Sequence, residues 1–593
     1  MIRDPELARL ADAVLIPPFP GHTPPRWILA ALESGLAGVT LFGPNVSDPE
    51  QIALLTAALR GATDEPVIAI DEEGGDVTRV TYWSGSLYPG NAALGAIDEP
   101  ELTERVHRAI GTDLAALGIN VDLAPCVDVL DEAENPAIGT RSFGADPALV
   151  ARHAAAAVRG LQSAGVAATA KHFPGHGSTR ADTHEVIASI SGDLAEVWRR
   201  DLPPFQAAIA AGAAAIMPGH LRLPELTGEL PASLSPAAMS GLLRGDLGFS
   251  GVIISDALEM RAVSGRYGIP EAAVMAVTAG VDLLCLGRDT SEDVYHAIIA
   301  ALSEAARSGR LPAGRLEDAA DRVARLRAWL AARPEIRPAS GTASGTQIGL
   351  QAARRALQRF GERPSLTNPV IVEVEPRGNI AVGRAAWGLG PWAPAGAVRR
   401  IAAAPLAAAV VGQAGFAPVP IPLEEGEKPA EEATAADLLA AAAGRSLVLV
   451  IRDAHRSPAT QNLVTSVLAD RPDAVVVEMG LPEWQPAAGS YGAYLATWGA
   501  ARVNAQAAAE VLGLIPGARR PGLGRGRLLI ADVGQGVADD GQTAGDGDQE
   551  RDLGFAFGVL VPGGPVVNVV RPDGDQSVDV VVVQTPGRVG HGK

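Results

Sequence analysis

A segment of fifteen residues, 171–185, combines side chains that suit proton transfer with side chains that can bind a polar substrate. Its sequence is KHFPGHGSTRADTHE, which places a lysine, three histidines and an aspartate around a Pro-Gly turn. Asp182 stands two residues before His184, and a carboxylate so placed can hold one imidazole nitrogen while the other exchanges a proton. The segment follows an apolar run, and a buried strand that ends in a polar loop commonly builds an active site. We therefore predict acid–base chemistry here.

The same segment offers ligands for zinc, which is the alternative interpretation. His172, His176, Asp182 and His184 are residue types that zinc accepts. The spacing His-x3-His also occurs in helical zinc sites, but the Pro-Gly pair between these two histidines excludes a regular helix. Proton transfer is the preferred interpretation, and we expect no metal and no other cofactor.

Three further motifs carry side chains suited to catalysis or binding. Asp256, in SDALEM, closes an apolar strand, where it can act as a nucleophile or as the N-cap of a following helix. Asp71 begins DEEGGDVTR, whose acids and paired glycines suit sugar hydroxyls, a metal or a plain acidic loop. Arg141, in NPAIGTRSFG, can clamp a substrate or form a structural ion pair. The residues alone leave these alternatives open.

The elements that must position these residues alternate regularly over the first 330 residues. Short apolar runs lie at 13–17, 38–42, 67–71, 120–124, 167–171, 213–217, 251–255 and 282–286. Helical patterns separate nearly all of them, as at 101–117, 147–164, 194–212 and 235–246. Eight strand–helix units predict a (β/α)8 TIM-like barrel of the α/β class, with a doubly wound open sheet as the alternative.

Polar residues recur at one position relative to these runs. Asp71, Lys171, His220 and Asp256 each stand at or just past the carboxyl end of a predicted strand. In a barrel these ends converge on one mouth, where catalytic groups belong. For His220, as for His176, bracing of a loop by hydrogen bonds is the preferred role.

The chain is too long for one ordinary domain. Residues 1–333 form the predicted catalytic barrel, and 334–346, rich in Pro, Ser, Gly and Thr, forms a predicted linker. Within 347–515, apolar runs such as 446–451 alternate with alanine-rich helical patterns, which predicts a second α/β domain. The tail 516–593 is rich in Gly, Asp and Val, and we assign it no role.

Composition and charge restrict the classes of partner. The formal net charge of -19 argues against a nucleic acid or a membrane as partner, since both require a positive face. The sequence contains neither a run that suits a transmembrane helix nor an N-terminal pattern typical of a signal peptide. Cys126 and Cys285 lie in apolar runs, which is typical of buried, reduced thiols and predicts a cytoplasmic location. The oligomeric state stays open.

Several motifs, taken in chain order, resemble those of glycoside hydrolase family 3. They are IDEEGG, NPAIGTRSFG, KHFPGHG followed by DTH, and IISDALEM. Within the family the resemblance is to the NagZ-type β-N-acetylglucosaminidases, and it covers about residues 10–330. Family members of the two-domain form carry a second α/β sandwich domain, which residues 347–515 resemble, so the resemblance implies such a domain there. Three details depart from the family pattern. Ser-Asp-Ala replaces the frequent Ser-Asp-Asp, and Asp76 stands where a basic residue is usual. The stretch 217–220, Met-Pro-Gly-His, also differs from the common family sequence, which leaves the finer substrate preference open.

The resemblance implies a retaining double displacement, with Asp256 as the nucleophile and the Asp182–His184 pair as acid and base. The residues that it implies for holding the sugar's hydroxyls and acetamido group are Asp71, Arg79, Arg141, Lys171 and His172. The implied activity is removal of terminal β-linked N-acetylglucosamine from peptidoglycan fragments, so the expected partner is a carbohydrate, either a muropeptide or a disaccharide. Phosphorolysis at the same site, another family 3 β-glycosidase activity and a sugar-binding protein without activity are the alternatives.

Overall fold

The fold comes from a computed structural model of the chain. The residues that it describes are 5–182, 186–288, 290–312, 314–333, 343–376, 379, 381–383, 386–403 and 431–515, with the side chains of 343–346 excepted.

Parallel strands near the start of the chain form a closed ring. The strands are β1 (Leu15–Ile16), β2 (Gly38–Leu41), β3 (Val67–Ile70), β4 (Val121–Asp122), β5 (Ala167–Phe173), β7 (Ala215–Pro218), β9 (Val252–Ile253) and β10 (Leu284–Cys285). Six of them pair in the order β2-β3-β4-β5-β7-β9, and β1 pairs with β10. A parallel bridge between Ile254 and Leu283 joins β9 to β10, and the amide of Thr40 donates to the carbonyl of Pro17 to join β2 to β1. The predicted barrel is confirmed, each predicted run overlaps a strand, and the open sheet is wrong.

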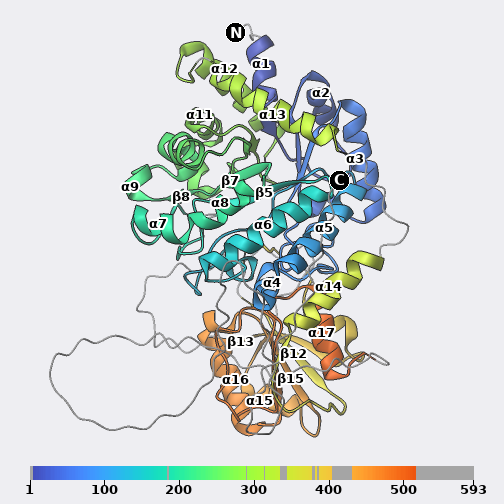
Figure 1. Ribbon diagram of the computed structural model, residues 1–593. Coiled ribbons are helices and arrows are strands. Elements are labelled where there is room, and N and C mark those ends of the chain that lie inside the picture. Colours follow the sequence, from blue (N-terminus) through green and yellow to red (C-terminus); the bar gives the residue numbers. More distant parts are fainter. Residues whose placement is uncertain are drawn as a thin grey trace, which may run out of the picture. The chain divides into compact units, whose positions relative to one another are not determined.

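Helices surround this ring, as Figure 1 shows. The main ones are α2 (Arg26–Ser34), α3 (Pro49–Ala62), α5 (Pro100–Ala116), α6 (Pro147–Ser163), α8 (Leu202–Ala210), η4 (Ala237–Asp246), α11 (Ile269–Ala279), α12 (Glu292–Ser308) and α13 (Arg315–Ala331). Asp48 and Asp146 cap α3 and α6 by accepting backbone amides, and each is followed by a proline in the first turn, where a missing N–H costs nothing. The predicted helix 194–212 is two helices, α7 (Leu194–Arg200) and α8, because a Pro-Pro pair starts a new helix after Asp201.

The alternation of side chains along the barrel strands decides which residues reach the interior. Ile68 and Ile70 of β3 pack in the cluster that contains the surrounding helices, whereas Val67 and Ala69 pack in the inner cluster closed below by α13. Because side chains alternate with a period of two, the residue after Ala69 on the inner face is Asp71. The same count leads from the inner Ala167 to Lys171 on β5. The alternation therefore directs the charged side chains of Asp71 and Lys171 into the mouth of the barrel.

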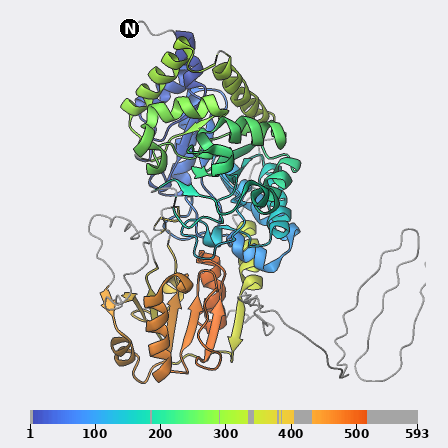
Figure 2. The same ribbon diagram turned by 90° about the vertical axis from the view of Figure 1, so that its left-hand side faces the viewer.

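A second sheet lies farther along the chain. Its strands are β11 (Gln358–Gly361), β12 (Val370–Val374), β13 (Val398–Ala403), β14 (Glu431–Ala433), β15 (Leu447–Ile451), β16 (Val475–Glu478) and β17 (Ala493–Ala496). They lie side by side in the order β11-β17-β16-β15-β12-β13-β14, with only the edge strand β11 antiparallel to its neighbour among the described pairs (Figure 2). Helices α15 (Ala435–Ala441) and α16 (Pro458–Asp470) pack on one face, and α17 (Arg502–Leu512) packs on the other. The result is a layered α/β sandwich.

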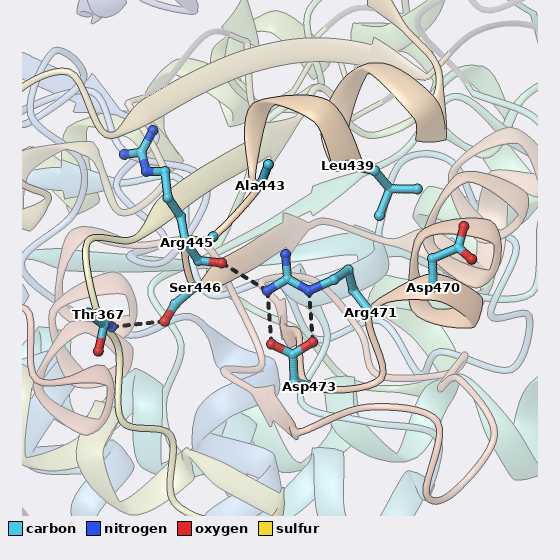
Figure 3. Close-up of a pocket in the computed structure, with 9 residues that line it drawn as sticks. Thr367, Leu439, Ala443, Arg445, Ser446, Asp470, Arg471 and Asp473 are labelled. Atoms are coloured by element: carbon cyan, nitrogen blue, oxygen red, sulfur yellow. Dashed lines mark hydrogen bonds and ion pairs between the residues drawn. The ribbon is translucent and has the colours of Figure 1, made fainter.

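The amino ends of these strands are tied together by a small polar network, which Figure 3 shows around a shallow hollow of about 570 Å³. Arg471 pairs with both carboxylate oxygens of Asp473 at 2.8 Å and donates to the carbonyl of Arg445. Ser446 accepts the amide of Thr367 at 2.8 Å. These bonds hold the segments that lead into β12, β15 and β16, so the polar groups of the hollow serve the fold.

The segments between and beyond the two sheets bear on the predicted boundaries. Helix α14 (Ala343–Ala356) includes the last four residues of the predicted linker, 343–346. The rest of that linker, 334–342, and the predicted tail, 516–593, lie outside the described residues. Among the helices that the structure describes, none combines the length and the apolar character needed to cross a membrane.

Candidate active site

A cavity of about 850 Å³ opens at the carboxyl ends of the barrel strands. Six of the eight predicted site residues line it, namely Asp71, Arg79, Arg141, Lys171, His172 and Asp256. They come from the ends of β3, β5 and β9 and from the loop after β4. The barrel mouth therefore collects side chains that are almost two hundred positions apart in the sequence.

Lys171, the inward-pointing residue of β5, lies at the centre of an ionic cluster. Its Nζ lies 2.6 Å from Asp71 Oδ1 and 2.8 Å from Glu73 Oε1. Arg141 grips the same Glu73 with two bonds, from Nε at 2.9 Å and from Nη2 at 2.7 Å. Burial alone would raise the pKa of Glu73, but the charges of Arg141 and Lys171 hold it well below its ordinary value. Glu73 is therefore ionised and lies between two cations, Lys171 and Arg141.

His172 is held in one tautomer by two neighbours. Its Nδ1 lies 2.7 Å from Asp128 Oδ2, and its Nε2 lies 3.3 Å from Arg141 Nη2. A guanidinium can only donate, so Nε2 is the acceptor and Nδ1 carries the proton that is donated to Asp128. Asp128 is buried and also accepts the backbone amides of His172 and His176. Although burial raises the pKa of such a carboxyl, the two histidines bring it far below its usual range.

Asp256 lies half-buried just beyond β9 and lines the same cavity as the lysine cluster. Its Oδ1 accepts the backbone amide of Ala257 at 2.8 Å. Helix α10 (Arg261–Tyr267) begins with Met260 at its N-cap, so Asp256 does not cap it. His220 donates from Nε2 to the carbonyl of Ala257 at 3.0 Å and bonds Ser233 through Nδ1 at 2.7 Å. His220 therefore braces the turn that presents Asp256.

His176 also makes the contacts of a bracing residue. Its Nδ1 lies 2.8 Å from Thr179 Oγ1, and its backbone amide donates to Asp128. Burial, reinforced by the nearby His172, lowers the pKa of His176 to about 4, so the ring is uncharged at neutral pH. Its ring meets that of His172 edge to face, with centroids 5.8 Å apart, and it forms part of the cavity wall.

The predicted acid–base pair lies on the loop after β5. Asp182 is half-buried, its carbonyl accepts the amide of Val186, and its charge acts on His176. It is not among the described residues that line the cavity. His184 lies outside the described residues. The Asp182–His184 pair therefore stays a prediction.

Residues that follow β12 of the second sheet complete one wall of the cavity. Arg79 donates from Nη2 to the carbonyl of Ala381 at 2.8 Å, and Ala381 and Gly383 line the cavity. Asn379 donates to the carbonyl of Pro136 in the loop after β4. Sequence reasoning did not find this contribution, because an Ala-Val-Gly stretch has no chemical signature.

A buried ion pair clamps the loop that carries Asp71 and Arg79. Asp76 Oδ2 lies 2.9 Å from Arg452 Nη2 of the loop after β15, and both side chains are nearly inaccessible. The same oxygen accepts Thr140 Oγ1 at 2.6 Å, while Oδ1 accepts the amide of Ala500 at 2.7 Å. Asp76, where the family usually has a basic residue, thus has an arginine partner nearly four hundred positions away.

The described part of the site contains three neighbouring atoms of types that can bind a metal. Cys126, Asp128 and His172 place one ligand atom each within 4.8 Å of the others. Asp128 already binds the other two, with Cys126 Sγ at 3.2 Å. Burial also raises the pKa of Cys126 well above its ordinary value, which opposes the thiolate that a metal needs. The arrangement fits a hydrogen-bonded brace for His172 better than a metal centre.

Comparisons with known proteins agree on one family. The model for the glycosyl hydrolase family 3 N-terminal domain matches residues 27–326. A β-hexosaminidase from Stenotrophomonas maltophilia (strain K279a) is 40% identical over 270 residues, which are 44% of this chain and 80% of that protein. The β-hexosaminidase LpqI of Mycobacterium tuberculosis is 37% identical over 266 residues, 44% of this chain and 67% of that protein.

A solved structure is similar over both sheets. It is a glycoside hydrolase family 3 β-N-acetylglucosaminidase from Paenibacillus, with a TM-score of 0.73 and 31% identity. The similarity covers 86% of this chain and 97% of that one.

Proposed function

Because the chain belongs to glycosyl hydrolase family 3 and is a glycoside hydrolase, we propose that it is a retaining exo-β-N-acetylglucosaminidase. Its substrate would be a cell-wall (peptidoglycan) fragment with a terminal β-linked N-acetylglucosamine. The observation that carries the proposal is that Asp256 and the ionic cluster of Lys171 line one cavity. The names of the similar β-hexosaminidases support the choice of sugar. The two free, buried cysteines are compatible with the cytoplasmic location that we include in the proposal.

In the first step, a carboxylate oxygen of Asp256 attacks the anomeric carbon. The bond from that carbon to the leaving oxygen breaks, and its electron pair stays with the oxygen, which takes a proton from His184. In the second step, His184 removes a proton from water, whose oxygen displaces Asp256 from the anomeric carbon. Two displacements at one centre give net retention. A histidine suits both roles because its ordinary pKa, about 6.5, is close to neutrality.

The ionic cluster would hold the sugar in place for this attack. Lys171 and Asp71 are already fixed by their ion pair, and Arg141 is fixed by its two bonds to Glu73, so these groups can bind hydroxyl and acetamido groups without reorganising. His172 lines the cavity beside Arg141 and would help to hold the sugar there, with Nε2 accepting from Arg141 Nη2 in the tautomer set by Asp128. Arg79, tied to Ala381, would contribute a further donor.

Product analysis tests the proposal. The substrate is N-acetylglucosaminyl-anhydromuramyl peptide, incubated with and without inorganic phosphate and followed by NMR. We expect β-N-acetylglucosamine to form first, with neither rate nor product changed by phosphate. The α anomer as first product would contradict retention. A sugar 1-phosphate that forms only with phosphate would instead establish phosphorolysis.

A further inference from the structure

The cavity has two chemically different walls. The ends of β3, β4 and β5 supply the charged wall described above. The loop after β2 supplies Phe42, Pro44 and Val46, which face the cavity together with Tyr82 and Trp83 from the end of the β3 loop. Hydroxyl and acetamido groups match the charged wall, so a substrate ring held there leaves the apolar wall for the next part of the substrate.

Trp83 is exposed to an extent that is unusual for its type. Its accessible fraction is 56%. Among the described residues, one other large hydrophobic side chain is similarly exposed, namely Leu54 at 74%. Leu54 lies within α3 and does not line the cavity, whereas Trp83 does. A large apolar ring left in water at the rim of a binding cavity suggests contact with a ligand.

The exposed ring of Trp83 is held in position by its neighbours. Its Nε1 donates to the carbonyl of Val46 at 3.4 Å, and its ring meets that of Tyr82 edge to face, with centroids 4.9 Å apart. Tyr82 in turn lies between Gly43 and Gly383, where an added Cβ would come within 3.5 Å and 3.0 Å of it. The missing side chain of Gly383 therefore makes room for the tyrosine that supports the tryptophan, and Gly43 lies in ordinary contact with its ring. The platform is formed before any ligand arrives.

We propose that Trp83, supported by Tyr82 and flanked by Phe42, binds the leaving-group sugar, the ring next to the cleaved bond. The ring's C–H face would stack on the indole, which suits the amphipathic character of both. The cavity, at about 850 Å³, is large enough for more than one pyranose ring. This inference rests on the proposed function and adds to it that Trp83 sets the specificity for the second ring of the substrate.

The test compares two substrates with the same terminal sugar. N,N′-diacetylchitobiose has a second ring, whereas methyl β-N-acetylglucosaminide has a methyl group in its place. In Trp83→Ala we expect kcat/KM for the disaccharide to fall about ten- to hundredfold. The methyl glycoside should change less than about twofold, since it does not reach the platform. Trp83→Phe should retain most of the disaccharide activity, and Leu54→Ala is the matched exposed control.

An equal loss on both substrates, or no loss on the disaccharide, would overturn the subsite. If wild-type protein cleaves neither substrate, the proposed function fails instead. Calorimetric binding of the intact disaccharide then still tests the platform, because equal affinity in wild type and Trp83→Ala would contradict it.

Discussion

The barrel and the second sheet both carry buried carboxylates near the carboxyl ends of parallel strands, yet they use them differently. Glu478, at the end of β16, accepts the backbone amides of Asp453, Ala454 and Gly480 at 2.7 to 3.3 Å. Glu373, on β12, accepts two backbone amides and pairs with Arg400. Both side chains are entirely inaccessible. In the second sheet, these carboxylates are used to shape the loops.

Two carboxylates of the barrel, Glu73 and Asp71, instead have a side chain as their shared partner and line a cavity. Glu73 and Asp71 pair with Lys171, and the side chain of Asp71 remains 20% exposed. Such groups can exchange a partner for a substrate hydroxyl, whereas a carboxylate surrounded by backbone amides cannot. A strand-end position is therefore a weak sign of function, and the kind of partner distinguishes Asp71 and Glu73 from Glu478. Substitutions in both regions test this difference in the roles of the residues.

The largest effect is expected for Asp256→Asn. We expect kcat/KM on a chromogenic N-acetylglucosaminide to fall by about four orders of magnitude or more, because the amide cannot act as the nucleophile. The thermal midpoint should stay within about 2 °C, since Asp256 is half-buried and contributes little to packing. Activity close to that of wild type would exclude Asp256 as the nucleophile.

A smaller loss is expected for Asp182→Asn, which keeps the shape of the side chain and removes its charge. Loss of a positioned acid–base partner should lower kcat by about 10²- to 10⁴-fold. The pH–rate profile should also shift, because the charge of Asp182 stabilises a protonated histidine. A variant whose pH–rate profile matches that of wild type would contradict the assignment of Asp182 and His184 as the acid–base pair.

The clamp between the two sheets gives the third prediction. Asp76→Ala leaves Arg452 buried without its carboxylate, so the free energy of unfolding should fall by about 3 kcal/mol. Adding Arg452→Met, which fills the space without a charge, should recover part of this loss in denaturant titrations. If the double variant is no more stable than Asp76→Ala, the cost does not come from the unpaired arginine.

The smallest effect concerns the pH dependence that Glu478 gives to stability. Burial, with the nearby Asp453, raises the pKa of Glu478 to about 8, so the folded protein holds a proton that the unfolded chain has released. This stabilisation is complete below about pH 4.5 and is lost as pH rises toward 8. Between pH 6 and 7, wild type should lose about 1 kcal/mol relative to Glu478→Gln, with activity retained. Equal losses in both proteins would contradict this.

The sequence predicts the barrel well because its signals are local. Eight apolar runs predict the strands. Because side chains alternate along a strand, the inward-facing Val67 of β3 predicts that Asp71 also points inward. The strand-end rule also selects Lys171 and Asp256. The division of the predicted helix 194–212 into two helices also has a local signal, because the Pro-Pro pair that separates them is visible in the sequence.

The partners of the site residues are harder to predict. Glu73 stands in the same acidic motif as Asp71, but only the folded chain brings it to Arg141, which is 68 positions away. Asp128 follows a strand, as the other site residues do, yet its role depends on the position of His172. The approach of Arg452 to Asp76 depends on how two sheets pack, for which neither residue carries a local signal.

The most direct test of the central claim is to trap the covalent intermediate on the barrel. In a 5-fluorinated β-N-acetylglucosaminyl fluoride, the nucleophile displaces fluoride from the anomeric carbon. The fluorine at C5 slows the second step, so the glycosyl ester of the enzyme accumulates. Peptide mass spectrometry should then find the mass of one fluorinated sugar on the peptide that contains Asp256, localised to that residue by fragmentation. An adduct on another carboxylate, such as Glu259 in the same cavity wall, or turnover without any adduct would contradict the account.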